Sequence, residues 1–162
     1  MPTIAKIIPY LWYAKEAEEA ARFYTSIFPN SRIERVTEMP TDTPSGPAGS
    51  VKVVEFTITG QPFIALMAGY LDPFNHAISF CVMCDDQAEI DKYWKALLDG
   101  GSEEECGWLK DRYGVSWQIV PTAIFDMMAD PDRKRAKRVA DAMLKMVKFD
   151  LATLQEAYKK PA

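Results

Sequence analysis

Residues 106–121, CGWLKDRYGVSWQIVP, have the most informative pattern in the chain, because they predict two strands and the turn between them. Trp108-Leu109 and Val115–Val120 each combine apolar and aromatic residues as short strands do. Asp111–Gly114 lies between them and is made of turn-forming residues that end in glycine. The stretch therefore predicts the last hairpin of a sheet.

The same pattern occurs earlier in the chain. Residues 60–66 (GQPFIAL) match residues 114–120 (GVSWQIV) at an offset of 54. A helical segment at 23–28 (FYTSIF) matches residues 93–98 (YWKALL), aromatic-aromatic-x-x-apolar-apolar, at an offset of 70. Since both matches occur in the same order, the sequence predicts an internal repeat.

Each repeat is predicted to be a strand-helix-strand-strand-strand (βαβββ) module, which makes the fold α+β. We place module one at about residues 4–69 and module two at about 76–122. The first module's helix spans 14–28, and Pro9 favours an edge position for its first strand. The remaining predicted elements are strands at 4–13, 32–39, 51–58, 63–67 and 76–83, a loop at 40–49, and a second helix that ends before Gly100-Gly101.

Residues 130–162 form a segment of different composition. They carry nine basic and five acidic residues, a net charge of +4, whereas the whole chain has a net charge of −4 and residues 1–129 therefore have −8. Asp130-Pro131-Asp132 starts a predicted amphipathic helix over 133–148, followed by a short helix over 151–158. The helix predicted over 133–148 has an apolar stripe, which is expected to pack on the domain at 1–129 or on a partner subunit. This stripe consists of Val139, Met143, Met146 and Val147.

Composition excludes several classes of protein. With 162 residues, 48% of them hydrophobic and 26% charged, the chain is expected to be one globular domain with a tail. The acidic balance disfavours nucleic-acid binding, and the basic run at 133–138 is better explained as a solvated helix face or an intramolecular or intersubunit contact. We expect a cytoplasmic protein with no membrane contact, because no apolar stretch approaches bilayer length, no signal peptide is evident, and three cysteines are too few for a disulfide scaffold.

Four stretches resemble a known family: IIPYLWYAKEAEEAARFYTSIFPNSRI, VKVVEFTITGQPFIAL, HAISF and above all CGWLKDRYGVSWQIVP. They are similar to the PhnB-like branch, often labelled "3-demethylubiquinone-9 3-methyltransferase", of the vicinal oxygen chelate superfamily. That superfamily also contains glyoxalase I, extradiol dioxygenases and the bleomycin- and fosfomycin-resistance proteins. The resemblance implies mixed sheets that curl into a cleft, and a homodimer.

The positions that match the superfamily's metal ligands are Pro9, Ile64, His76 and Gln118. Proline and isoleucine side chains cannot bind a metal, and catalytic metals typically have three protein ligands. We therefore predict no metal and no cofactor, with a divalent cation on His76 and Gln118 as the alternative. His76 is otherwise a polar pocket or capping residue at the start of a strand, or a general base.

The methyltransferase label is not supported by the sequence. Methyltransferases that use S-adenosylmethionine bind it on a glycine-rich loop between a strand and a helix, and no such loop occurs here. S-adenosylmethionine is therefore not expected as a cofactor.

Other residues are candidates for a ligand site. Trp12 and Trp108 offer flat apolar surfaces, and Glu55 on its strand faces either solvent or a polar cleft, where burial would raise its pKa into the acid/base range. Cys106 is either a nucleophile with His76 as its base or a buried, pocket-lining thiol. Cys81 and Cys84, three apart on a strand, should point to opposite faces and are interpreted as buried structural thiols.

The function predicted from these observations is binding of a small organic, possibly aromatic, molecule in the inter-sheet cleft without a metal. The ligand-binding candidates are Trp12, Glu55, His76, Trp108 and Gln118, and the catalytic candidates are His76, Glu55 and Cys106. A metal-dependent lyase, isomerase or dioxygenase of the same superfamily is the first alternative. The second is a subunit-interaction role for the tail helix.

Overall fold

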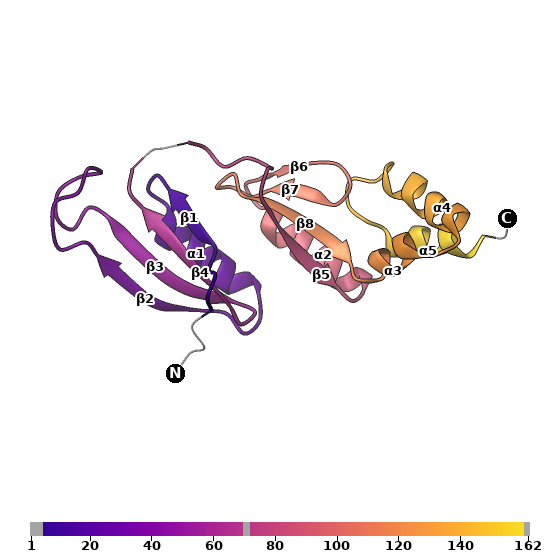
Figure 1. Ribbon diagram of the computed structural model, residues 1–162, viewed down its shortest axis with the longest axis horizontal. Helices are drawn as coiled ribbons and strands as arrows, with labels where there is room; N and C mark the ends of the chain where they lie inside the picture. The colour runs from indigo at the N-terminus through magenta and orange to yellow at the C-terminus, as the bar shows by residue number, and fades with distance from the viewer. Residues whose placement is uncertain (1–4, 70–71, 161–162) are drawn as a thin grey trace. The chain divides into compact units, whose positions relative to one another are not determined.

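The computed structural model describes residues 5–69 and 72–160 and divides into two compact units, Met1–Asp72 and Pro73–Ala162 (Figure 1). The first unit is a four-stranded mixed sheet in the order β1-β4-β3-β2, with β1 parallel to β4 and the other pairs antiparallel. One helix packs on this sheet. The elements in chain order are β1 (Tyr10–Tyr13), α1 (Ala17–Ile27), β2 (Arg32–Glu38), β3 (Lys52–Ile58) and β4 (Gln61–Met67).

Alternation along β3 builds the core of this unit. Val54, Phe56 and Ile58 are buried, and Phe56 stacks on Tyr24 of α1 with ring centroids 6.4 Å apart. The same ring lies 5.5 Å from Phe63 of β4. Because strand side chains alternate between faces, this arrangement gives one face of the sheet to α1 and leaves Val53, Glu55 and Thr57 on the other.

The second unit repeats the arrangement, with strand order β5-β8-β7-β6 and β5 parallel to β8. Helix α2 packs on one face of this sheet and buries Ile90, Trp94 and Leu97. Three further helices follow the sheet in sequence. The elements are β5 (Ser79–Cys84), α2 (Gln87–Leu98), β6 (Ser102–Glu103), β7 (Trp108–Lys110), β8 (Ser116–Pro121), α3 (Ala123–Ala129), α4 (Arg133–Met143) and α5 (Leu151–Lys159).

The twofold βαβββ prediction is confirmed, and β1 lies at a sheet edge as Pro9 indicated. Other details differ from the predictions. Strand β1 covers Tyr10–Tyr13, whereas a strand was predicted over 4–13. Strand β5 begins at Ser79, so His76 lies in an exposed turn before it rather than at the start of the strand. The helix predicted over 133–148 ends at Met143, and neither α3 nor the two-residue β6 was predicted, because both are too short to show a period.

The turn within residues 106–121 is held by the buried carboxylate of Asp111. It accepts hydrogen bonds from the backbone N–H of Tyr113 at 2.8 Å and of Val115 at 3.1 Å, and from the indole Nε1 of Trp117 at 2.9 Å. Arg112, beside it, donates to the carbonyl and carboxylate of Asp99 after α2. The motif DRYGVSW thus fixes the β7–β8 hairpin and joins it to the end of α2.

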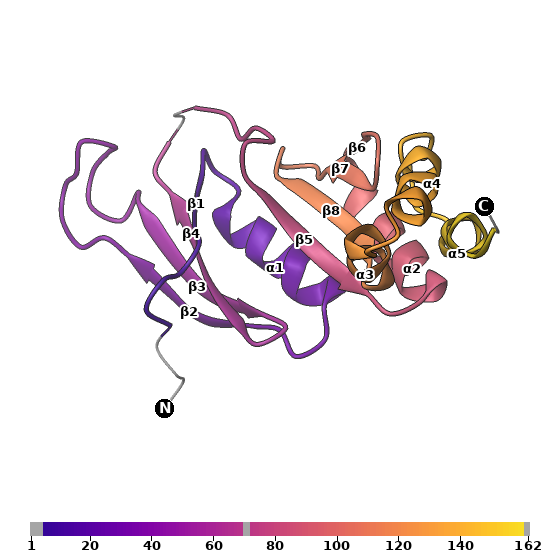
Figure 2. The same cartoon turned by 45° about the vertical axis from the view of Figure 1, so that its right-hand side comes forward.

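The tail packs on its own unit. Val139 of α4 and Leu154 of α5 are fully buried in a cluster that is completed by Val120, Ile124, Met127 and Phe149. Both views show α3, α4 and α5 gathered at the end of the sheet where β5 and β8 finish (Figures 1 and 2). Of the predicted apolar stripe, Val139, Met143 and Met146 contact this cluster, whereas Val147 is exposed. Over the described residues, no helix is both long and apolar enough to cross a membrane.

Candidate ligand-binding cavity

A cavity of about 510 Å³ lies within the second unit, over the face of β7 and β8 that is turned away from α2. Trp108 and Gln118 are register partners on this face, and Val120 follows two residues later. Leu109 and Ile119, the alternate residues, are fully buried on the other face. The period of two in these strands therefore directs an indole and an amide into the cavity.

The remaining walls come from segments after the sheet. Helix α3 contributes Ile124, Phe125, Met128 and Ala129, and the tail contributes Met143 and Phe149. Phe125 is 53% exposed, although it lines the cavity. An exposed aromatic side chain at the wall of an apolar cavity is suited to contact a ligand.

None of the lining residues carries a charged side chain; the polar side chains are those of Gln118 and Cys106. The Gln118 amide donates from Nε2 to Ser79 Oγ at 2.9 Å, and within residues 5–69 and 72–160 its Oε1 receives no hydrogen bond. The thiol of Cys106 lies 3.7 Å from the Met143 carbonyl oxygen. The cavity thus offers apolar surface, a thiol and one amide oxygen that can accept a hydrogen bond.

The loop at Cys106-Gly107 fastens the tail beside the cavity. Both residues have positive φ values, 57° and 80°. Their backbone N–H groups donate to the carbonyls of Met146 at 2.9 Å and Val147 at 2.7 Å. A Cβ at Gly107 would lie 2.5 Å from the ring of Phe149, so glycine is required for this close approach.

The structure brings together three of the predicted site residues, Cys106, Trp108 and Gln118, in this cavity. Trp12 and Glu55 belong to the first unit, where the Trp12 indole donates to Gly69 O at 3.0 Å. His76 does not line the cavity; it is exposed and makes no hydrogen bond or ion pair within the described part of the chain. No contact therefore supports His76 as a base for Cys106.

Glu55 does not have the environment expected for an acid/base group. Arg35, its register partner on β2, donates to the Glu55 carboxylate from both Nε and Nη2, the second bond being 2.9 Å long. These hydrogen bonds lower the pKa of Glu55, and its side chain remains 33% exposed. Of the two alternatives for Glu55, a pKa raised into the acid/base range is therefore not found: the cross-strand arginine stabilises the ionised form and outweighs the effect of burial.

The positions that match the superfamily's metal ligands do not provide a donor set for a divalent cation. Pro9 and Ile64 have no side-chain donor atom, and the Gln118 amide nitrogen is bonded to Ser79. Among the residues that the structure describes, no group of three or more His, Cys, Asp or Glu side chains could hold a metal ion. One amide oxygen and one exposed imidazole fall short of the usual three ligands.

The two cysteines of β5 differ from each other. Cys84 is fully buried, and burial raises the pKa of its thiol to about 12. Cys81 is exposed, so the interpretation of both thiols as buried is wrong for Cys81. Their opposite burial agrees with the opposite faces expected for residues three apart on a strand.

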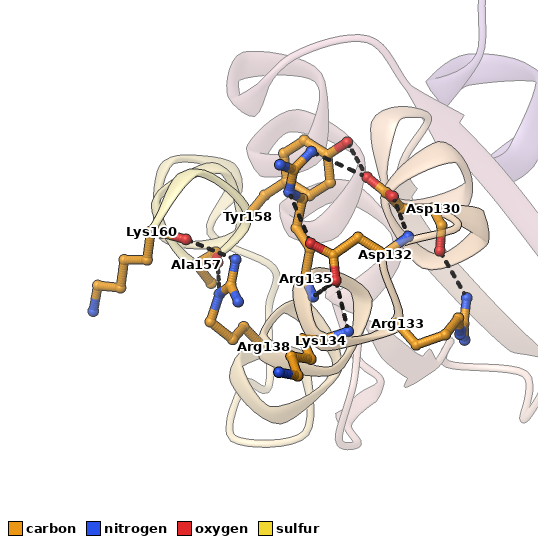
Figure 3. Close-up of polar contacts among 9 residues, drawn as sticks. All are labelled: Asp130, Asp132, Arg133, Lys134, Arg135, Arg138, Ala157, Tyr158 and Lys160. Carbon is orange, nitrogen blue, oxygen red and sulfur yellow. Dashed lines mark hydrogen bonds and ion pairs between the residues drawn. The ribbon is translucent and has the colours of Figure 1, made fainter. Parts of the chain in front are cut away.

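The basic run of the tail is largely used for internal contacts (Figure 3). Arg138 donates to the carbonyls of Ala157 at 3.1 Å and Lys160 at 2.7 Å, which closes the end of α5. Arg135 lies 5.1 Å from the Tyr158 ring centroid, and Tyr158 donates to Asp130 at 2.6 Å. These contacts agree with an intramolecular role for Arg135 and Arg138, one of the interpretations that the sequence left open.

Several cavity residues were not singled out from the sequence: Ile124, Phe125, Met128, Met143 and Phe149. The helical stripe did include Met143, but only as a packing residue. Helix α3 has seven residues, which is too few for a helical period to show which side chains face a cavity.

The fold and the motif together define the class. Two βαβββ units built on four-stranded mixed sheets are the architecture of the glyoxalase/bleomycin-resistance folds, that is, of the vicinal oxygen chelate superfamily. Within it, the sequence profile of the family described as 3-demethylubiquinone-9 3-methyltransferase matches residues 5–120, and the chain belongs to that PhnB-like family.

Solved structures agree. A putative 3-demethylubiquinone-9 3-methyltransferase, PhnB protein, from Bacillus cereus is 33% identical, with 72% of this chain and 99% of that chain covered and a TM-score of 0.62. The fosfomycin resistance protein FosX from Mesorhizobium loti is 12% identical (79% and 99% covered, TM-score 0.56), and FosX from Listeria monocytogenes, complexed with Mn(II) and sulfate, is 15% identical (72% and 91%, 0.51). The FosX structures support the fold alone. None of the curated proteins matches the chain.

Proposed function

We propose that this protein binds a small, neutral, planar organic molecule with a hydrogen-bond donor in the cavity of its second unit. The observation that carries the proposal is the cavity itself. Its volume of about 510 Å³ falls in the range of roughly 300–1,000 Å³ that is typical of small-molecule sites. The sequence predicted a ligand in an inter-sheet cleft, whereas this cavity is lined by residues of the second unit.

The lining supports the chemical class of the ligand. A lining without charged side chains disfavours an ionic ligand, because a buried ion without a partner pays a large desolvation penalty. Trp108 and Phe125 offer aromatic faces to a flat ring. The Gln118 Oε1 atom would accept the ligand's hydrogen bond, since Nε2 holds the amide in place through its bond to Ser79.

We propose that binding requires neither a metal nor S-adenosylmethionine. The donor atoms at the superfamily's metal positions support the first part, as argued above. The second part is supported by the uncharged lining, which has no partner for the charged sulfonium, amino and carboxylate groups of that cofactor.

The test uses N-phenyl-1-naphthylamine, a neutral aromatic dye with one N–H donor that fluoresces in apolar sites. Wild-type protein should bind it with a stoichiometry of one, and EDTA should leave its Kd unchanged. Ala129→Trp places a large side chain at a lining position that is itself exposed, so it should weaken binding at least about tenfold without unfolding the chain.

The matched control is Ala152→Trp, because Ala152 is an exposed alanine of helix α5 that does not line the cavity. This variant should bind the dye as the wild type does. Absence of saturable binding to the wild type, or equal affinity in wild type and Ala129→Trp, would overturn the proposal. Loss of binding in EDTA would overturn its metal-free part.

A further inference from the structure

We propose that two tail residues, Met143 and Phe149, determine the size of the molecule that the cavity accepts. This inference rests on the proposed function and goes beyond it. The tail lies outside the family-profile match, which ends at residue 120. The tail nevertheless supplies part of the cavity wall. The residues that select the ligand by size would therefore lie outside the region that matches the family.

Phe149 is a fixed part of the wall. It is only 2% exposed, and its ring lies against Gly107. Its backbone is held from α2 by one amide side chain, since Gln87 Nε2 donates to the Phe149 carbonyl at 3.0 Å and Gln87 Oε1 accepts from the Leu151 N–H at 2.8 Å. A ring held in this way cannot retreat from a larger ligand without breaking these contacts.

Met143 is the adjustable part. It is the last residue of α4, and its side chain is partly buried between the cavity and the tail core. An unbranched thioether side chain has several accessible rotamers and adapts its shape to a neighbour. Substitution of Met143 by alanine would therefore lengthen the cavity toward α4 while Phe149 keeps its place.

The segment between these residues is anchored independently of any ligand. The carbonyls of Met146 and Val147 accept from the Cys106-Gly107 loop, and Lys148 forms an ion pair with Asp91 of α2. With the backbone held at these points, a change in ligand preference would come from the side chains that face the cavity rather than from movement of the tail.

The experiment measures Kd for two neutral dyes, N-phenyl-1-naphthylamine and the larger Nile red, and uses their ratio. Met143→Ala should shift this ratio about tenfold in favour of Nile red, because the larger molecule gains the vacated volume. Met143→Leu, which nearly conserves volume, should keep the wild-type ratio. A ratio cancels any loss of folded protein, which lowers the apparent affinity of both dyes alike.

The matched control is Met146→Ala, because Met146 belongs to the same segment and packs on the same core but does not line the cavity. It should leave the ratio unchanged. An unchanged ratio in Met143→Ala, or an equal shift in Met146→Ala, would overturn the inference while binding of the first dye leaves the proposed function intact. Failure of the wild type to bind either dye would overturn both.

Discussion

At the scale of single residues, the clearest structural role belongs to Asp111. Asp111 is 3% exposed, and its carboxylate accepts hydrogen bonds from three donors of the tight hairpin. Ionised carboxylates accept such bonds strongly, and buried donors that lose their acceptor carry the full desolvation cost. These three hydrogen bonds explain why an acidic residue is buried in this hairpin.

We predict that Asp111→Ala lowers the free energy of unfolding by about 2–4 kcal/mol, since it removes the acceptor of three hydrogen bonds, two from backbone N–H groups and one from the Trp117 indole. Asp111→Asn retains one oxygen and should lose less. Urea denaturation followed by tryptophan fluorescence measures both changes. A difference below about 0.5 kcal/mol between the free energies of unfolding of the wild type and Asp111→Ala would show that these bonds contribute little.

The thiols provide a second prediction at this scale. Because burial raises the pKa of Cys84 to about 12, its reactive thiolate is scarce at pH 8. Treatment of native protein with N-ethylmaleimide at pH 8 should leave Cys84 unmodified while the exposed Cys81 reacts. Peptide mass spectrometry distinguishes the two sites. Modification of Cys84 at the rate of Cys81 without denaturant would contradict its described burial.

Residues of the site were predictable from sequence where strand alternation governs them. Trp108 was a candidate for its flat apolar ring and Gln118 for its polar side chain, and the period of two in β7 and β8 places both on one face of the sheet. The environment of Glu55 was not predictable, because it depends on the register of β2 against β3. That register contains an irregularity between Ile33 and Arg35, which brings Arg35 opposite Glu55.

At the scale of elements, one amide side chain makes two of the hydrogen bonds between α2 and the tail. Gln87 donates to Phe149 and accepts from Leu151, so it satisfies one carbonyl before α5 and one N–H in its first turn. Helix α5 has nine residues, too short to be stable without tertiary contacts.

We predict that Gln87→Ala costs about 1–2 kcal/mol of local stability, because both bonds are lost. Hydrogen exchange measured by mass spectrometry should show faster exchange in peptides covering residues 144–159, with little change in the first unit. Lys95→Ala, an exposed substitution on the same helix, serves as the control. Equal exchange of the tail in wild type and Gln87→Ala would refute this anchoring role.

Acid should loosen the same tail. The pKa values of Asp91, Asp130 and Asp150 lie below their ordinary value of 3.8, owing chiefly to hydrogen bonds from Lys148, Tyr158 and the Thr153 backbone respectively. Carboxyl groups with a lowered folded pKa stabilise the fold above the unfolded value, and this contribution is lost as the pH falls through the folded one. All three groups bind elements of the tail.

We therefore predict that protection of α5 from hydrogen exchange, corrected for the intrinsic rate, decreases as the pH falls below about 4. Asp150→Asn retains a capping oxygen that does not titrate, so it should reduce this dependence. Protection that stays constant down to pH 2.5 would contradict the assignment of these carboxylates as anchors.

Long amphipathic elements were predictable because their apolar periods extend over several turns, as in α1 and α2. The end of α4 was not, since basic residues and methionines continue beyond Met143 without a helix breaker. The chain instead turns at Leu144 and extends along the Cys106-Gly107 loop, a tertiary contact that forms one cavity wall. Local sequence carries little information on such a contact.

At the scale of the whole molecule, the chain is two repeated units with a helical extension on the second. The repeat was predictable because matched residues occur in the same order, and the unequal charge of body and tail was evident from counting. What the repeat could not show is that the cavity is made where the two units differ. Helix α3 and the tail helices have no counterpart among the elements of the first unit.

The most direct test of the central claim is methyl NMR of the eight methionines during titration with N-phenyl-1-naphthylamine. Met128 and Met143 line the cavity, whereas Met39 and Met67 belong to the first unit. We predict saturable shifts of the Met128 and Met143 methyl signals, with those of Met39 and Met67 unchanged. Shifts confined to Met39 and Met67, or no saturable shift at all, would contradict a ligand site in the second unit.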